Sequence, residues 1–165
     1  MPSTVNISQA LDGKDRRILA LVQRDGKLPQ AEIARQVGLS AAAVNERLKK
    51  LENAGVIRRY VAVVDPRALG ASVTAFVEVF IEHPRFESAF ITRVRGMDEV
   101  QEVHHITGEF SLLLKIRTTG MEALQQLLIH RLNAMEGVRQ TRTVIALSTS
   151  KEESFVDTAA EGETP

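Results

Sequence analysis

The stretch that decides the fold of the N-terminal part runs from Gln30 to Leu51 and reads QAEIARQVGLSAAAVNERLKKL. Its apolar residues recur at helical spacing on both sides of Gly38, so the stretch predicts two helices joined at that glycine. Ala34 is small enough for the helices to cross closely, and Gly38 can adopt the left-handed conformation of a sharp turn. Val44 is apolar and is expected to pack between the two helices. This is the spacing of a helix-turn-helix, an outline that also occurs in proteins that never touch DNA.

The flanking residues supply the ends of three helices. Asp12 is a predicted N-cap for a first helix, which Asp25-Gly26 ends, and Pro29 suits the first turn of a second. Ser40 is the predicted N-cap of a third helix, which stops at Gly55. The residues expected to face inward are all apolar: Ile18, Leu19 and Val22, then Ile33, Ala34 and Val37, then Val44, Leu48 and Leu51.

The outward face of the third predicted helix carries residue types that suit a DNA major groove. Small residues at its start allow close approach, an amide can pair with adenine, and cations can reach guanine edges or phosphates. The alternative is an ordinary solvated face, which we prefer for Glu46 and Asn53. Arg58 and Arg59 either lie beside the phosphates as a short wing or are ordinary surface arginines. The predicted contacts with double-stranded DNA are Ser40, Ala41, Ala42, Asn45, Arg47, Lys49, Lys50 and Arg59.

A segment rich in β-branched residues follows the third helix. Val56 to Val64 contains four valines and an isoleucine, and Asp65-Pro66 comes directly after it. This composition predicts a strand that ends at Asp65-Pro66 and leads out of the small domain.

Residues 72–148 show the pattern of two βαβ-like halves, in the order β-α-β-β-α-β. This order is that of a ferredoxin-like domain, so the whole chain is predicted to be an α+β protein. The expected strands are Ser72–Glu82, Val100–Thr107, Phe110–Arg117 and 138–148, and the expected helices are 86–95 and a segment from about Met121.

Apolar side chains occur on both faces of this predicted sheet. Phe76 and Phe80 alternate with Val77 and Val79, and Leu113 lies between two further leucines. The two helices of such a domain cover one face, so the other would expose an apolar patch unless a second subunit covers it. The pattern therefore predicts a homodimer, which would present two recognition helices to DNA half-sites.

Charge differs between the two parts of the chain. Residues 1–60 hold 11 Lys and Arg against 6 Asp and Glu, a net charge of +5, whereas residues 61–165 hold 10 against 15, a net charge of −5. A basic domain attracts polyanions because binding releases condensed counterions. We expect two domains with different partners, with a boundary between about residues 57 and 71.

Composition excludes several classes of protein. The 165 residues are 25% charged and 44% hydrophobic, which is typical of a globular chain of one ordinary domain or two small ones. No uninterrupted apolar run of ~18 residues could span a bilayer, and the first ten residues lack the features of a secretory signal. We expect a cytoplasmic protein without a membrane partner.

Catalytic and metal-binding patterns are not found. His104 and His105 are adjacent on a predicted strand and so point to opposite faces, His83 and His130 lie elsewhere, and the chain has no cysteine. Neither a Gly-x-Ser-x-Gly nor a Gly-x4-Gly-Lys-Ser/Thr sequence occurs. The sequence predicts that the protein is not an enzyme and needs no cofactor or metal.

The turn at Thr107–Ser111 is the candidate small-molecule site. Backbone amides at a glycine turn, beside hydroxyl groups, can hold a carboxylate. An ordinary hairpin turn is the alternative. We expect the effector to bind in a pocket between subunits of this C-terminal domain. The predicted effector-binding residues are His105, Thr107, Gly108, Glu109, Ser111, Thr141 and Thr143.

Several segments together carry a family resemblance: Leu11–Leu19, Ile33-Ala34, Val37–Ser40, Val44 with Arg47-Leu48 and Leu51-Glu52, and Gly55–Ile57 with Tyr60. Here the chain resembles the Lrp/AsnC, or feast/famine, transcription regulators, and similar spacing continues to residue 149. The resemblance implies a winged N-terminal helix-turn-helix, a connecting strand, and a C-terminal RAM/ACT-like domain that binds an amino acid or related effector. It also implies dimers that assemble further into tetramers or octamers.

One position departs from the family at the candidate effector turn. The family pattern is Gly-Asp/Glu-Tyr/Phe-Asp, in which the last aspartate helps to hold the amino group of a bound amino acid. Gly108, Glu109 and Phe110 match it, but Ser111 replaces the aspartate. A hydroxyl group offsets a buried ammonium group less well than a carboxylate does. Either Glu109 or Glu102 supplies the charge, or the ligand is not a standard amino acid, or the protein works without one.

The expected organisation is therefore residues 1–60 for DNA binding, 61–71 as strand and linker, 72–149 for effector binding and assembly, and 150–165 as an acidic, disordered tail. An alternative for the tail is that it docks on its own dimer up to Phe155. We predict a sequence-specific DNA-binding transcription regulator. The rival function is an effector-sensing or assembly module with little specific DNA binding, and an amino-acid-metabolising enzyme is disfavoured by the missing catalytic groups.

Overall fold

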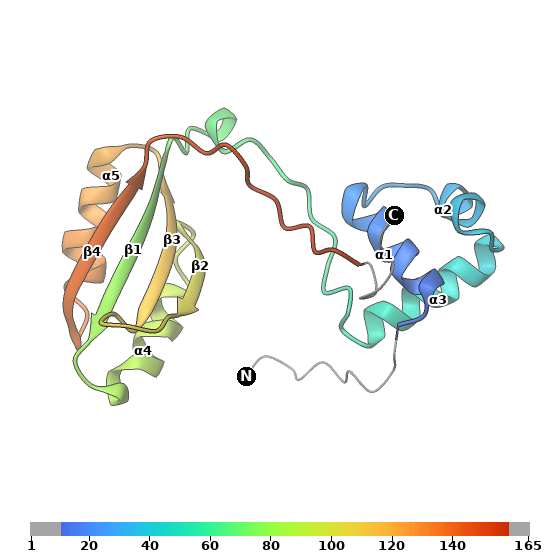
Figure 1. Cartoon of the computed structure of the whole chain (residues 1–165). Coiled ribbons are helices and arrows are strands. Elements are labelled where there is room, and N and C mark those ends of the chain that lie inside the picture. The colour runs from blue at the N-terminus through green and yellow to red at the C-terminus, as the bar shows by residue number, and fades with distance from the viewer. Residues whose placement is uncertain (1–10, 159–165) are drawn as a thin grey trace. The chain divides into compact units, whose positions relative to one another are not determined.

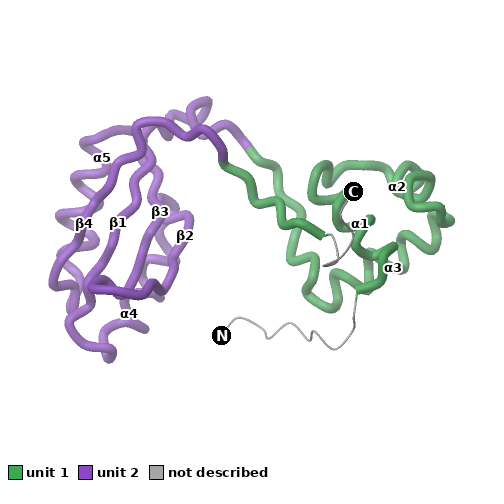
Figure 2. The backbone as a smooth tube through the Cα atoms, viewed as in Figure 1, with its two compact units in different colours: residues 1–63, 152–165 green, residues 64–151 purple. Residues whose placement is uncertain are grey.

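The structure, a computed structural model, describes residues 11–158. The chain forms two compact units: a helical unit of residues 1–63 with 152–165, and a sheet unit of residues 64–151 (Figure 2). None of the helices in the described part is long and apolar enough to cross a membrane.

The described part of the helical unit contains three helices, α1 (Gly13–Arg24), α2 (Gln30–Val37) and α3 (Ala41–Asn53) (Figure 1). Each predicted end is confirmed within a residue or two. Asp12 caps α1 by accepting from the Asp15 backbone N–H at 2.8 Å, and the Ser40 hydroxyl accepts from the Ala43 N–H at 3.2 Å at the start of α3. Gly38 ends α2 with φ +66°, a left-handed conformation that favours glycine.

The three helices bury one apolar cluster. Its members are Ile18, Leu19, Ile33, Ala34, Val37, Val44, Leu48 and Leu51, with Val22 partly buried at its edge. The side chain of Lys14 also donates to the backbone carbonyl of Val37, at the end of α2, and so fastens α1 to α2. The inward-facing residues expected from helical periodicity are therefore confirmed.

The predicted strand over residues 56–66 is not formed. Residues 58–65 have no regular secondary structure, and Val61, Val63 and Val64 are 65%, 89% and 57% exposed. A strand needs a hydrogen-bonded neighbour, and the four-stranded sheet of this chain does not include this segment. After it, Asp65 caps the short helical turn η1 (Pro66–Leu69).

The sheet unit has the predicted β-α-β-β-α-β order. Its strands are β1 (Val73–Ile81), β2 (Val100–His105), β3 (Leu112–Thr118) and β4 (Val138–Ala146), and its helices are α4 (Pro84–Val94) and α5 (Met121–Gln126), which continues as a wider π-helical turn, η2 (Leu127–Leu132). The strand order β2-β3-β1-β4 is antiparallel throughout. The ferredoxin-like fold is confirmed.

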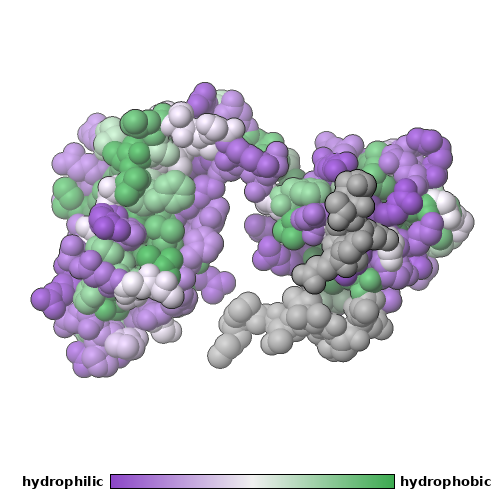
Figure 3. Space-filling model, in the orientation of Figure 1, coloured by the Kyte–Doolittle hydropathy of each residue, from purple (hydrophilic) through white to green (hydrophobic). Residues whose placement is uncertain are grey.

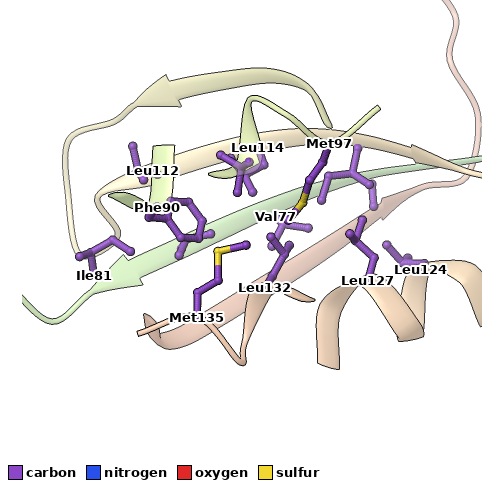
Figure 4. Close-up of a cluster of buried hydrophobic side chains, with 14 residues drawn as sticks. Val77, Ile81, Phe90, Met97, Leu112, Leu114, Leu124, Leu127, Leu132 and Met135 are labelled. Carbon is purple, nitrogen blue, oxygen red and sulfur yellow. The ribbon is translucent and has the colours of Figure 1, made fainter. Parts of the chain in front are cut away.

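Both helices of the sheet unit pack on the same face of the sheet (Figure 4). Alternate residues of β1, from Ala75 to Ile81, point into this core. They meet Leu112 and Leu114 of β3, Phe90 of α4, and the leucines of α5 and η2. This face is the hydrophobic core of the unit.

The opposite face, which we call the open face, is apolar in part. Phe76 and Val144 are cross-strand partners, and they are 36% and 54% exposed. In Figure 3, hydrophobic residues gather over the strands. Charged residues border them, including Glu78 and Arg142, which also face each other across β1 and β4. The open face therefore combines an exposed apolar strip with charged groups.

Candidate DNA-binding helix and effector site

The packing of α3 decides which of its side chains are exposed. Val44, Leu48 and Leu51 are buried, so the rest of the helix surface turns outward. Of the predicted DNA contacts, Ser40, Ala41, Ala42, Lys49 and Lys50 are exposed, and so is Arg59 beyond the helix. Asn45 and Arg47 are partly buried.

Asn45 lies against the start of α2. Its side-chain Oδ1 accepts from Nε2 of Gln30 at 3.3 Å. This contact joins the first residue of α2 to the fifth residue of α3. A side chain held in this way loses less rotational freedom when it pairs with a base edge.

Arg47 forms ion pairs with two carboxylates of the helical unit. Its Nη1 atom lies 2.6 Å from carboxylate oxygens of both Asp12 and Asp15, and the Asp15 side chain is only 5% exposed. The Asp15 N–H, and after it the Arg47 guanidinium, hold the pKa of the Asp12 carboxyl below its usual value, and the two carboxylates raise the pKa of Arg47. The ion pairs therefore fasten α3 to the N-terminus of α1.

The lysines of α3 are placed differently from Arg47. The Lys49 side chain is 60% exposed, and its ammonium lies 3.7 Å from the Glu46 carboxylate, a pair that solvent screens strongly. Lys50 is exposed on the same helix. These two cations are accessible to a phosphate.

The segment after α3 is hydrogen-bonded to that helix through Tyr60. The Tyr60 hydroxyl donates to the Glu52 carboxylate at 3.2 Å, and partial burial, together with this bond, raises the pKa of Tyr60. Arg59 precedes this anchor and is exposed. The anchor therefore holds Arg59 near the C-terminal end of α3.

The candidate effector turn closes onto β1 as well as β3. The Ile106 N–H donates to the Ser111 carbonyl at 3.0 Å, and the Ser111 N–H donates to the Val79 carbonyl at 3.1 Å. Gly108 has φ +116°, and Phe110 is buried. The turn is therefore held by the sheet on both sides of the glycine.

Arg142 is the charged residue that the fold brings to this turn, and the sequence pattern does not reveal it. Its guanidinium carbon lies 5.1 Å from the centroid of the Phe110 ring, and it forms an ion pair with Glu78. Glu78, and more weakly Glu109, raise the pKa of Arg142. Only the strand register, which pairs Glu78 with Arg142, reveals this cluster.

Thr141 and Thr143 point away from that cluster. Their cross-strand partners are Val79 and Val77, whose side chains enter the helix-covered core. The Thr141 hydroxyl also bonds to Oδ1 of Asn133 at 3.0 Å. These two threonines therefore lie on the opposite face of the sheet from Arg142.

His105 lies at the far edge of the sheet from β4. Its register partner is Leu112, which faces the core, and its Nε2 atom contacts the Glu87 carboxylate of α4. Thus one chain does not bring His105, the 107–111 turn and the two threonines into a single pocket.

Glu102, one of the two acids considered for an ammonium partner, already contacts two other side chains, a histidine and a lysine. Its carboxylate lies 3.0 Å from His104 Nε2 and 2.9 Å from Lys115 Nζ. The hydrogen bonds from His104 and then Lys115 hold the pKa of Glu102 below its usual value. Glu109, the other acid considered, lies in the turn itself. Among the described residues no group of three or more His, Cys, Asp or Glu side chains is arranged to hold a metal ion.

Two family models match this chain. Residues 11–58 match a winged helix-turn-helix DNA-binding model, and residues 74–156 match the Lrp/AsnC ligand binding domain.

Curated relatives and solved structures agree with these matches. The chain is 38% identical to the HTH-type transcriptional regulator FL11 of Pyrococcus abyssi over 87% of this chain and 93% of that protein. It is also 38% identical to the leucine-responsive regulatory protein of Escherichia coli, over 86% of this chain and 88% of that protein. A transcriptional regulator from Neisseria meningitidis, solved as a complex with L-methionine, superposes with a TM-score of 0.84 at 31% identity, over 88% of this chain and 95% of that one.

Proposed function

Because this chain belongs to the Lrp/AsnC family of transcriptional regulators, we propose that it binds operator DNA by placing the N-terminal half of α3 in the major groove. The observation that carries the proposal is the outward face of α3. Small residues and an amide come first on this face, and two exposed lysines follow them. The buried apolar residues on the other side of the helix fix its orientation in the unit. We propose that the activity is binding rather than catalysis, and that the protein acts in the cytoplasm, where its DNA lies.

The residues of α3 take different roles in this proposal. Ser40, Ala41 and Ala42 let the helix start approach the groove, and Asn45 reads a base edge. Lys49, Lys50 and Arg59 neutralise phosphates, which adds affinity without sequence preference. Arg47 acts by holding α3 in place, because both of its carboxylate partners belong to the chain itself.

The test compares single alanine variants in a DNA-binding titration. Lys49→Ala and Lys50→Ala should each weaken binding and lower the salt slope by about one phosphate contact. Arg95→Ala, which removes an exposed cation after α4, is the matched control and should leave binding unchanged. Equal affinity for the lysine variants and the control would contradict the assignment of α3.

We also propose that the effector is an amino acid bound at the open face, beside the 107–111 turn. An amino acid carries a carboxylate and an ammonium group. Arg142 of β4 contacts the Phe110 ring of the turn and pairs with Glu78, and the charge of Glu109 also acts on it. Glu109 supplies the negative charge that Ser111 lacks. The L-methionine complex of the Neisseria relative supports an amino acid as the ligand.

Calorimetric titration with L-methionine and the other standard amino acids tests this site. If the site is right, one of them binds, and Arg142→Gln weakens that binding at least about tenfold, because the carboxylate loses a charged donor. Arg139→Gln, on the same strand, is the matched control and should bind as the wild type does. Equal loss in both variants would place the site elsewhere.

The exposed apolar strip of the open face supports a homodimer. Phe76 and Val144 form one cross-strand pair of that strip, and a second subunit would cover it. Tetramers or octamers would follow from further contacts between such dimers. Each dimer presents two copies of α3 to DNA half-sites.

A further inference from the structure

The C-terminal segment packs on the first helix of the DNA-binding unit. The Gln23 side chain donates to the Val156 carbonyl at 3.0 Å and accepts the Val156 N–H at 2.9 Å. Arg16 donates to the Thr158 carbonyl at 3.2 Å, and the guanidinium carbon of Arg24 lies 5.7 Å from the Phe155 ring centroid. All these contacts are with α1, and most go to backbone groups of the segment.

The spacing of these contacts describes an extended peptide that runs antiparallel to α1. Arg24 and Gln23 meet Phe155 and Val156, while Arg16, two turns earlier, meets Thr158. Three extended residue steps cover about 10 Å and eight helical steps about 12 Å, so the lengths match. Phe155 and Val156 remain 40% and 68% exposed, so polar contacts rather than apolar burial hold the segment.

The net negative charge of residues 61–165 is concentrated in this segment. All five charged residues among residues 152–165 are acidic: Glu152, Glu153, Asp157, Glu161 and Glu163. Residues 64–151 hold 10 Lys and Arg and 10 Asp and Glu, so the sheet unit is neutral. The net charge of −5 that the second part of the chain carries therefore belongs wholly to the segment after Lys151.

The described part of this segment, which contains Glu152, Glu153 and Asp157, belongs to the basic helical unit. Residues 1–63 hold 11 Lys and Arg against 6 Asp and Glu, a net charge of +5, which the five acids of residues 152–165 balance. Positive charge on a DNA-binding unit sets its attraction for phosphates, and opposing charge within a Debye length, about 8–10 Å, reduces that attraction.

We propose that the outward face of α1, formed by Arg16, Gln23 and Arg24, is a docking surface for the chain's own acidic C-terminal segment, and that the docked segment restrains DNA binding. The proposal rests on the DNA-binding function proposed above. DNA binds best when the segment is displaced or its charge removed. The restraint acts most strongly on non-specific DNA, whose binding is almost wholly electrostatic.

Docking can be measured without DNA. The chain has no cysteine, so Val156→Cys gives a single site for a nitroxide label, and the contacts at this position use its backbone. The label should broaden the NMR signals of α1 amides, and Gln23→Ala should reduce that broadening, whereas Gln126→Ala in the sheet unit should not. Absence of broadening on α1 would overturn the docking surface.

The effect on DNA is measured with a random-sequence duplex over a salt series. Two variants are compared with the full chain: a truncation after Lys151, and a full-length chain with Glu152→Gln, Glu153→Gln, Asp157→Asn, Glu161→Gln and Glu163→Gln, which keeps the backbone contacts. Both should bind about tenfold more tightly at low salt and with a steeper salt slope. Thermal unfolding of each variant reports whether the fold is retained.

The outcomes separate this proposal from the one it rests on. If the full chain binds DNA and the neutralised segment changes neither affinity nor slope, the restraint is overturned although DNA binding stands. If no form binds DNA, the DNA-binding function fails and the restraint fails with it, while the label still shows whether the segment docks.

Discussion

At the residue scale, two cations of α3 that are two positions apart in the sequence have different environments. Arg47 contacts the carboxylates of Asp12 and Asp15, whereas Lys49 contacts an exposed glutamate on its own helix. The helical pattern alone predicts both as outward cations, because it contains no information about which surface residue another helix will contact. Such tertiary partners are the part of the site that sequence periodicity does not reveal.

This difference predicts different effects on stability. Arg47→Ala leaves the buried Asp15 carboxylate without its cation and should lower the free energy of unfolding by about 1–2 kcal/mol. Lys49→Ala should change it by less than about 0.5 kcal/mol, as is usual for surface substitutions. Urea unfolding followed by circular dichroism measures both values. A smaller loss for Arg47→Ala than for Lys49→Ala would show that the ion pairs do not hold α3.

At the scale of elements, local signals predicted the helices and their caps well. Asp12, Gly38 and Ser40 act where the sequence placed them, because capping depends on a few neighbouring residues. The segment 56–66 failed as a strand, since its valines favour extended backbone but cannot supply the neighbour that a strand requires. Sequence alone points to the two threonines of β4 as site residues, and only the register shows that Arg142, between them, faces the turn.

The N-terminal cap of α1 should make the helical unit sensitive to acid. The pKa of Asp12 is lowered from 3.8 by the Asp15 N–H and by Arg47, so the ionised carboxylate is favoured in the folded state. Its contribution is therefore complete above the unfolded pKa and is lost as the pH falls through the lower, folded value. Arg35 and Gln36 lower the pKa of Glu32 to about 2. Ionised Glu32 therefore also stabilises the folded state, and this contribution is likewise lost in acid.

Asp12→Asn isolates this effect, because the amide oxygen can still cap the helix but does not titrate in this range. The stability difference between the wild type and Asp12→Asn should be largest near neutral pH and should shrink below about pH 4. Thermal unfolding of both proteins over a pH series measures the difference. A difference that stayed constant with pH would mean that the charge of Asp12 does not contribute.

At the scale of the whole molecule, the exposed apolar strip predicts self-association through the open face. Val144→Glu places a charge in that strip and should shift the protein from dimer towards monomer, with a dimer dissociation constant raised at least about tenfold. Met121→Glu is the matched control, since Met121 is equally exposed, at 56%, but begins α5 on the covered side of the sheet.

Sedimentation velocity over a concentration series measures this shift. The wild type and the Met121→Glu control should sediment as dimers or larger assemblies at concentrations where Val144→Glu sediments as a monomer. If all three proteins sediment alike, the open face is not the interface between subunits.

The central claim is that the protein is a sequence-specific DNA-binding regulator that uses α3. Its most direct test is fluorescence anisotropy of the full chain with a labelled DNA fragment from upstream of its own coding region, against a scrambled fragment of equal length, over a salt series. We expect a steep fall of affinity with salt and a clear preference for the upstream fragment, because phosphate contacts are combined with base contacts. Weak binding with no preference and a salt slope near zero would contradict it.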